Sequence, residues 1–225
     1  MAIPLKEFSM DAFKTLKSRQ EAEIIVKKSR FIGIAFPCDS VELFEKEVER
    51  IQNKYSGARH YCYGYRLIEE NIINERYQDD KEPSGTAGLP ILEVIRHHDL
   101  LQCAVVVVRY FGGTLLGTGG LSRAYSDAAR DAINASEVIR QIEALECEIV
   151  ADYHFSGKLE YFLNSENIPI VDTDYTNHVV YTVVIKKEQY DLLNHQVKNI
   201  GSNQIEFYTR RDVSGYFEGK DFIEQ

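Results

Sequence analysis

The chain has 225 residues, of which 26 are basic and 35 acidic, with a net charge of −9, four cysteines and no tryptophan. Its 44% hydrophobic and 27% charged residues are typical of globular proteins and exclude a disordered or collagen-like chain. At ~150 residues per domain, the length fits one large domain or two small ones. The longest apolar run, residues 103–108, is far shorter than the ~20 residues of a membrane-spanning helix.

Charged residues near the start of the chain and widely spaced cysteines indicate the cellular compartment of the protein. Lys6, Glu7 and Asp11 interrupt the apolar block that a secretory signal needs. The cysteines, at positions 38, 62, 103 and 147, are far apart, and we expect them to be reduced and buried. Together these features predict a cytoplasmic protein that is not bound to a membrane.

The negative charge is unevenly distributed along the chain. Residues 1–135 carry 18 basic and 19 acidic side chains, whereas residues 136–225 carry 8 and 16. The first part is therefore nearly neutral and the second has a net charge of −8. An acidic protein disfavours a nucleic-acid partner, but this objection does not apply to the first part, which could carry a basic face.

The first part mixes strands and helices. Residues 24–26 and 31–36 are β-branched and aromatic runs that predict two strands. Apolar positions 41, 44, 48, 51 and 55 follow helical spacing, with Asp39 as the expected N-cap and Glu42 completing a capping box. Residues 60–67 alternate, which predicts a strand with Tyr61, Tyr63 and Tyr65 on one face and His60, Cys62 and Arg66 on the other.

Further elements follow in chain order. Residues 72–77 predict a returning strand, 89–97 a helix, and 101–109, the most hydrophobic segment, a buried central strand. Beyond a glycine-rich stretch, one helix carries an apolar stripe made of Leu121, Tyr125, Ala128, Ala132 and Ile133.

After residue 135 the pattern changes. Strands are predicted at residues 146–153, 169–173, 179–185 and 204–209, and helices at 157–164 and 188–199. This order, βαββαβ, is the ferredoxin-like arrangement. We therefore predict an α+β protein with a first domain at residues 1–135, a second at 136–212 and a tail at 213–225.

Two glycine loops are candidate anion sites. The first, residues 81–88, offers Ser84 and Thr86, and Thr86 could cap the following helix while the amides of its first turn hold an anion. The second joins a buried strand to a helix, a context in which amides cradle phosphate, and it contains Gly112, Gly113, Gly117, Gly119 and Gly120. It lacks the Lys of a Walker A loop and the third glycine of a dinucleotide fingerprint. Each loop could equally be only a tight turn.

The signals for catalysis and for metal binding are weak. His60 and Cys62 share a strand face, but no third group orients the histidine. Ser84 lacks the setting of a nucleophile elbow, and His97, His98 and Cys103 lack metal-ligand spacing. We assign no catalytic residue, cofactor or metal. The acidic turn at residues 79–82 is more typical of a solvated surface than of a cation site.

Basic residues accompany the tyrosine-rich strand, and cations beside aromatic rings suit single-stranded RNA. The set could also be an ordinary solvated face. Its members are Lys27, Lys28, Arg30, Arg59, His60, Arg66, Arg109 and Arg123.

Four segments resemble the YigZ/IMPACT family: KKSRFI, ARHYCYGYRL, DDKEPSGTAGLPIL and VVVVRYFGGTLLGTGGLSRAYSDAA. The resemblance covers residues 27–133, and the later region resembles the small C-terminal domain of bacterial members. It implies a first domain like domain IV of elongation factor G and ribosomal protein S-five, and a second domain like domain V of elongation factor G. It also implies a link to the regulation of translation, which eukaryotic relatives exert through a protein partner.

Three functions remain open. The leading hypothesis is a non-enzymatic protein that binds RNA, the ribosome or a translation-associated protein. The alternatives are an enzyme for a phosphorylated small molecule, in which Glu82, Ser84 or His60 transfers protons, and a protein-interaction module. The candidate nucleic-acid or phosphate site comprises Arg59, His60, Arg66, Ser84, Thr86, Arg109, Gly112, Gly113, Gly117, Gly119, Gly120 and Arg123.

Overall fold

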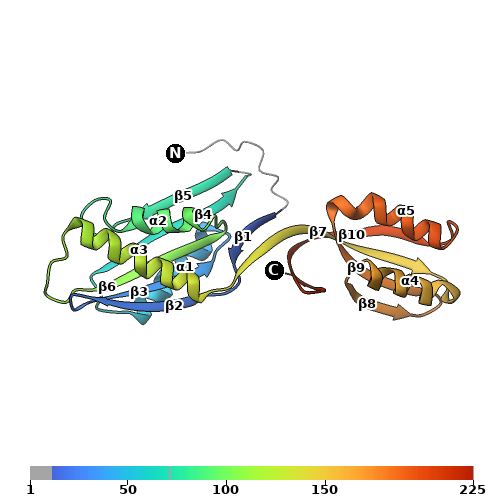
Figure 1. Ribbon diagram of the computed structural model, residues 1–225, viewed down its shortest axis with the longest axis horizontal. Coiled ribbons are helices and arrows are strands. Elements are labelled where there is room, and N and C mark those ends of the chain that lie inside the picture. Colours follow the sequence, from blue (N-terminus) through green and yellow to red (C-terminus); the bar gives the residue numbers. More distant parts are fainter. Residues whose placement is uncertain (1–11, 71, 225) are drawn as a thin grey trace. The chain divides into compact units, whose positions relative to one another are not determined.

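The computed structural model describes residues 12–70 and 72–224. The chain forms two compact units that divide between Ile139 and Arg140. Both are α+β, with antiparallel sheets and helices packed on them, as predicted (Figure 1). The helices of the described residues include none that is long and apolar enough to cross a membrane.

A five-stranded antiparallel sheet forms the centre of the first unit, after the short strand β1 (Ala12–Leu16). Its strands are β2 (Gln20–Val26), β3 (Ser29–Pro37), β4 (His60–Glu69), β5 (Ile72–Gln78) and β6 (Cys103–Tyr110), in the spatial order β2-β3-β6-β4-β5. The strand β6 is central, and its side chains from Cys103 to Arg109 are all buried. This confirms the expectation from its unbroken apolar run.

Helices cover both faces of this sheet. The helices α2 (Gly88–His97) and α3 (Thr118–Ala135) pack on one face, and α1 (Val41–Lys54) packs on the other. The predicted alternation in β4 is confirmed, because Cys62 belongs to the core beneath α2 and α3, whereas Tyr61, Tyr63 and Tyr65 lie on the side of α1. Side chains of a strand point to opposite faces in turn, which is why the sequence alone predicts this division.

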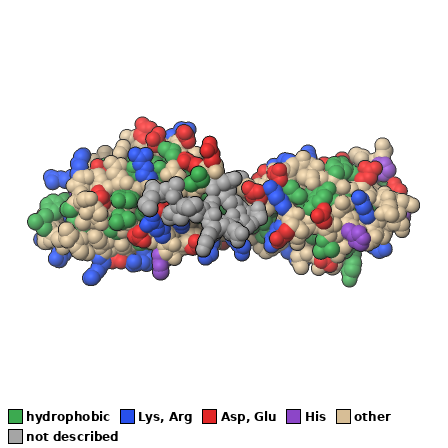
Figure 2. Space-filling model, turned by 90° about the horizontal axis from the view of Figure 1, so that it is seen from above, with side chains coloured by type: hydrophobic (Ala, Val, Ile, Leu, Met, Phe, Trp, Pro, Cys, Tyr) green, Lys and Arg blue, Asp and Glu red, His purple; other side chains and the backbone are tan. Residues whose placement is uncertain are grey.

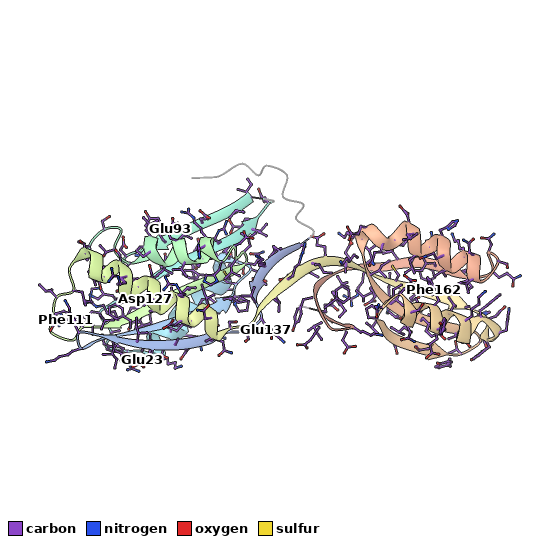
Figure 3. All side chains as sticks on the ribbon, in the orientation of Figure 1. Glu23, Glu93, Phe111, Asp127, Glu137 and Phe162 are labelled. Carbon is purple, nitrogen blue, oxygen red and sulfur yellow. The ribbon has the colours of Figure 1, made fainter. Side chains whose placement is uncertain are left out.

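One end of the first unit gathers the segments that the sequence marks as candidate sites. The register pairs Arg30 with Tyr110 and His60 with Arg109, so the start of β3, the end of β6 and the start of β4 lie together. Tyr63 pairs with Gln78, which brings the end of β5 and the first glycine loop to the same end. We call this region the loop end; Figure 3 labels Phe111 at its tip.

The second unit follows the predicted βαββαβ order. Its elements are β7 (Val138–Ala151), α4 (Tyr153–Ser165), β8 (Ile170–Tyr175), β9 (Val179–Lys186), α5 (Tyr190–Ile200), β10 (Glu206–Glu218) and β11 (Asp221–Glu224). The strand order is β11-β10-β7-β9-β8. Residues of α4 and α5, including Leu159, Leu163, Leu193 and Val197, bury one face of this sheet.

Local predictions differ from the structure at three places. Ser40, rather than Asp39, is the N-cap of α1, because its side chain accepts the amide of Leu43. Residues 213–224, expected to be a tail, complete β10 and form β11. The strand β7 begins at Val138, well before residue 146, where the first strand of the second domain was predicted. Each of these features depends on partners distant in the sequence or on one hydroxyl's orientation.

Candidate functional site

The first glycine loop binds a carboxylate that belongs to the protein itself. The Asp79 carboxylate accepts hydrogen bonds from the amides of Gly85, Ala87 and Gly88, at 2.8, 3.0 and 2.8 Å. These amides lie at the N-terminus of α2, where unpaired N–H groups and the helix dipole favour negative charge. The sequence places an anion at this position, but it does not reveal that Asp79 supplies it.

Neither hydroxyl of the first loop takes the predicted part in anion binding or capping. Thr86 is buried and donates its hydroxyl to the Pro83 carbonyl at 2.7 Å. The N-cap position of α2 is Ala87, and no side chain caps the helix there. The prediction that Thr86 caps α2 is therefore wrong. Ser84 is exposed at the surface of the same loop.

The second glycine loop is open. It runs from the end of β6 to α3, whose N-cap is Gly117 with φ = +73°, and no side chain caps this helix. A Cβ added at Gly113, Gly117 or Gly119 would meet nothing within 4 Å. Gly112 is different, because its Cβ would lie 2.0 Å from the carbonyl carbon of Lys28. The loop is thus fixed at Gly112 and open beyond it.

Arg109 is at the centre of a buried polar network beneath the loops. Only 4% of the residue is exposed, and Nη1 lies 2.5 Å from the Glu82 carboxylate. Nη2 donates to the Ser29 hydroxyl at 3.4 Å, and the guanidinium lies over the rings of Phe31 and Phe111, 5.2 and 5.5 Å from their centroids. We expected Arg109 to contact phosphate, but it is bound within the protein and neutralises Glu82.

Glu82 joins this network to the helix and to β4. The Tyr125 hydroxyl donates to its carboxylate at 2.8 Å, and His60 Nε2 lies 3.8 Å from the same oxygen. The side chain of Glu82 is only 4% exposed. Through Glu82 the first glycine loop is linked to Arg109, which lies near the end of β6, the strand that leads into the second loop.

His60 and Cys62 are neighbours of this network, but they do not form a nucleophilic pair. Cys62 Sγ contacts the Asp79 carbonyl at 3.0 Å and the Tyr125 hydroxyl at 3.5 Å. Burial raises the pKa of the Cys62 thiol above its usual range, with Glu82 and the aspartates adding to the effect, so a thiolate is disfavoured. Burial, reinforced by Cys62 and Glu82, likewise raises the pKa of Tyr125.

The other cysteines are also buried and free, as predicted. Burial raises the pKa of Cys38 and Cys147 to about 11, and that of Cys103 to about 12. Within the described ranges, no three His, Cys, Asp or Glu residues are arranged to hold a metal ion.

Exposed cations surround the buried network. Their side chains make no hydrogen bond or ion pair with other described residues. They lie in the β2–β3 turn, in the first glycine loop, just before β4 and in the first turns of α3. They are Lys27, Lys28, Arg59, Lys81 and Arg123. Figure 2 shows Lys and Arg side chains at the surface of this left end of the first unit, with hydrophobic side chains among them.

The structure separates some residues that we had grouped. Arg66 is six positions along β4 from His60, where it binds Glu75 at 2.8 Å and the Leu100 carbonyl at 3.0 Å. Arg30 is paired with Glu23 at 2.7 Å. Both cations are therefore engaged, and Arg66 lies away from the loop end. The structure brings His60, Ser84, Thr86, Arg109, the glycines, Arg59 and Arg123 to this end, in different states of burial.

Sequence analysis did not identify four participants in the site. Ser29 follows a turn and receives both Arg109 and the Gly112 amide, the latter at 3.1 Å. Tyr125 belonged to a predicted apolar stripe, yet its hydroxyl binds Glu82. Lys81 lies within the first loop, and Phe111 directly precedes the second. The aromatic residue and flanking charges beside the glycines were the available signal.

A separate groove lies on the opposite face of the sheet. It has a volume of about 260 Å³ and lies between α1 and the strands β4 and β5. Phe44, Tyr63 and Tyr65 line it, together with Arg76 and acidic residues of α1. None of the residues predicted as candidates for the site lines this groove.

Comparisons with known proteins agree with the two-unit structure. Residues 27–133 match the Impact N-terminal domain, and residues 149–204 match a domain of unknown function, DUF1949. A structure described as the crystal structure of an hypothetical protein aligns with a TM-score of 0.59 at 27% identity, covering 90% of this chain and 98% of the other.

Two bacterial relatives extend over both units. IMPACT family member YvyE of Bacillus subtilis (strain 168) is 32% identical over 180 residues, which cover 80% of this chain and 82% of that protein. IMPACT family member YigZ of Escherichia coli (strain K12) is 33% identical over 161 residues, covering 71% and 79%. Protein IMPACT of Danio rerio is 35% identical over 80 residues, 32% of this chain and 25% of its own length. The chain belongs to the IMPACT family.

Proposed function

We propose that this protein binds RNA, alone or within the ribosome, through the loop end of its first unit. The observation that carries the proposal is the group of five exposed cations at the loop end, whose side chains make no ion pair with other described residues and which accompany a helix, α3, without an N-cap side-chain hydrogen bond. Phosphate groups supply the negative charge that such a surface lacks, and contacts to phosphate account for most of the affinity of non-specific nucleic-acid binding.

The carboxylates of the same end do not compete for these cations. Asp79 is bound by three amides, Glu82 by Arg109 and Tyr125, and Asp80 accepts the Tyr61 amide at 2.8 Å. The acidic groups of the first loop are therefore used inside the protein. This internal pairing supports a positive outer surface on a unit whose sequence is nearly neutral in total.

The open amides of the second glycine loop favour the same ligand. Amides at the start of α3 point their N–H groups toward the N-terminal end of the helix, where the dipole attracts anions. Among the described residues, no side chain makes a capping hydrogen bond there, in contrast to Asp79 at α2. A phosphate bound there would interact favourably with both the helix terminus and the neighbouring Arg123.

The link to translation rests on the family. The motifs of residues 27–129 resemble those of a family whose members are associated with translation regulation, which favours ribosomal or messenger RNA as the ligand. A cytoplasmic location is part of this proposal. The acidic second unit would then orient the protein or bind a protein partner.

The enzyme hypothesis receives less support from the geometry. A general base must reach the proton it removes, but Glu82 is 4% exposed and already accepts from Arg109 and Tyr125. His60 faces the same carboxylate. Ser84 is exposed, and its hydroxyl makes no hydrogen bond with another described residue.

The test is the salt dependence of RNA binding. The double variant Arg59→Ala/Arg123→Ala removes two exposed cations without disturbing the network around Arg109. For a single-stranded RNA we expect the slope of log K against log salt concentration to become shallower by about 1.4, since each phosphate contact contributes about 0.7. Fluorescence anisotropy with a labelled RNA fragment measures this slope.

Lys158→Ala/Lys198→Ala is the matched control, because it removes two exposed cations from α4 and α5 of the second unit, neither of which makes an ion pair with another described residue. It should leave the slope nearly unchanged. If both double variants reduce the slope equally, only total charge matters and the loop end is not the binding surface. An absence of RNA binding at low salt would contradict the proposal altogether.

A further inference from the structure

Phe111 is an exposed aromatic ring held in place at the tip of the loop end. The residue is 40% exposed, although it lies only two positions after the buried Arg109 of β6 (Figure 3). The Arg109 guanidinium lies over the ring at 5.5 Å from its centroid, and Arg109 is itself fixed by Glu82. A cation over one face leaves the exposed remainder of the ring available for a second flat group.

The backbone on both sides of Phe111 is also fixed. The Gly112 amide donates to the Ser29 hydroxyl, and Gly112 packs directly on the Lys28 carbonyl, where no Cβ could fit. On the preceding side, the Arg59 amide donates to the Arg109 carbonyl at 3.3 Å. The backbone on either side of Phe111 is therefore tied to the two neighbouring strands at the end of β6, although the glycine loop follows it.

Two exposed cations flank this ring, and neither makes an ion pair with another described residue. The start of β3 and the start of β4 lie on either side of the end of β6, so Lys28 and Arg59 are brought to opposite sides of Phe111. Neighbouring strands are ~4.8 Å apart, which places the two backbones about 10 Å from one another. This spacing suits phosphates on each side of one nucleotide whose base contacts the ring.

We propose that Phe111 is a stacking site for an unpaired nucleobase, so that the loop end binds single-stranded rather than fully paired RNA. The inference rests on the proposed function, because the flanking phosphate contacts are those of Lys28 and Arg59. In a duplex the faces of the bases are covered by stacking, whereas an unpaired base can leave the strand and lie on an aromatic side chain. Such stacking tolerates any base, since every base has a π-face.

Because the chain contains no tryptophan, a single introduced tryptophan can report directly on binding through its fluorescence. Phe111→Trp introduces a single tryptophan at the proposed site, and its fluorescence should be quenched when an oligouridylate of about 10 nucleotides binds. Tyr161→Trp is the control, because Tyr161 is 77% exposed on α4 of the second unit and should show no quenching. Phe111→Ala should weaken oligouridylate binding about 5- to 150-fold, the range that corresponds to the loss of one stacked base.

Binding of inorganic polyphosphate distinguishes the contribution of the bases from that of the phosphate charge. It carries phosphates but no bases, so it should bind wild type and Phe111→Ala equally and should not quench the tryptophan at position 111. An RNA hairpin with a fully paired stem and a minimal loop should bind more weakly than the oligouridylate at equal salt.

The outcomes distinguish this inference from the proposed function. If oligouridylate binds with the expected salt dependence, but Phe111→Ala binds as tightly as wild type and Phe111→Trp is not quenched, the stacking site is refuted and RNA binding through cations stands. Failure of the wild type to bind oligouridylate, polyphosphate and the hairpin refutes both. Equal weakening of polyphosphate and oligouridylate by Phe111→Ala would show that the substitution disturbs the fold, and would overturn the stacking argument.

Discussion

The two glycine loops of the first unit lie at the same end of one sheet, and each leads into a helix that no N-cap side chain closes. The first loop binds the carboxylate of Asp79, whereas the second leaves its helix terminus open. Two loops with similar sequences thus differ in whether a side chain of the protein occupies their amides. The first is internally satisfied and supports the fold, whereas the second is the loop that we propose binds an external anion.

Glu82 is the point at which the two loops depend on each other. Replacing it by alanine would leave the buried Arg109 guanidinium without its partner, and we expect a loss of about 3–5 kcal/mol in the free energy of unfolding of the first unit. Hydrogen exchange of peptides from β6 measures this loss, and peptides from β9 of the second unit serve as the internal control.

A double variant tests the cause of that loss. Glu82→Ala/Arg109→Met removes the uncompensated charge, so it should be markedly more stable than Glu82→Ala alone. If the double variant is as unstable as the sum of the two single variants, the ion pair does not couple the loops, and the comparison fails.

Asp79→Ala would make the first loop resemble the second. It removes a carboxylate that accepts three amide hydrogen bonds, and we expect a loss of about 2–3 kcal/mol in unfolding free energy. The vacated amides should then accept inorganic phosphate, so that phosphate raises the Tm of the variant more than that of wild type. Asp79→Asn, which keeps one acceptor oxygen, should lie between the two in stability. A variant whose Tm responds to phosphate no more than wild type would show that the first loop cannot be converted into an anion site.

Two glycine substitutions sharpen the contrast within the second loop. Gly112→Ala forces a Cβ against the Lys28 backbone and should cost about 1–3 kcal/mol. Gly119→Ala meets open space at the start of α3, and its effect should stay within about 0.5 kcal/mol. Thermal unfolding of both variants checks the ranking. Equal losses would mean that the loop is packed along its whole length rather than fixed only at Gly112.

The sequence alone predicts most of the local structure. The alternation in β4, the apolar run of β6 and the helical spacing of α1 each depend on neighbouring residues, so the periodicity is sufficient to place them. The βαββαβ order of the second unit follows from the same patterns. Strands β1 and β11 were missed because they are short and show no strong alternation.

Prediction of the site was less complete, for a physical reason. Sequence motifs show that glycines, hydroxyls and cations are present, but the state of each depends on strand register and burial. Arg109 is a residue type that commonly binds phosphate, and yet it is neutralised by Glu82, 27 residues away. Arg66 shares a strand face with His60, but Glu75 on the neighbouring strand engages it.

What the sequence by itself determined is therefore the division of charge, the order of elements and the position of two glycine loops before helices. Only the tertiary structure decided which cations are free and which loop is open. Hydrogen bonds and ion pairs form between side chains that the sheet register brings within about 3 Å, and the register joins residues far apart in the chain. Arg59 and Arg123 remain exposed because no carboxylate of the described residues reaches them, whereas Asp79 and Glu82 are already bound inside the loop end.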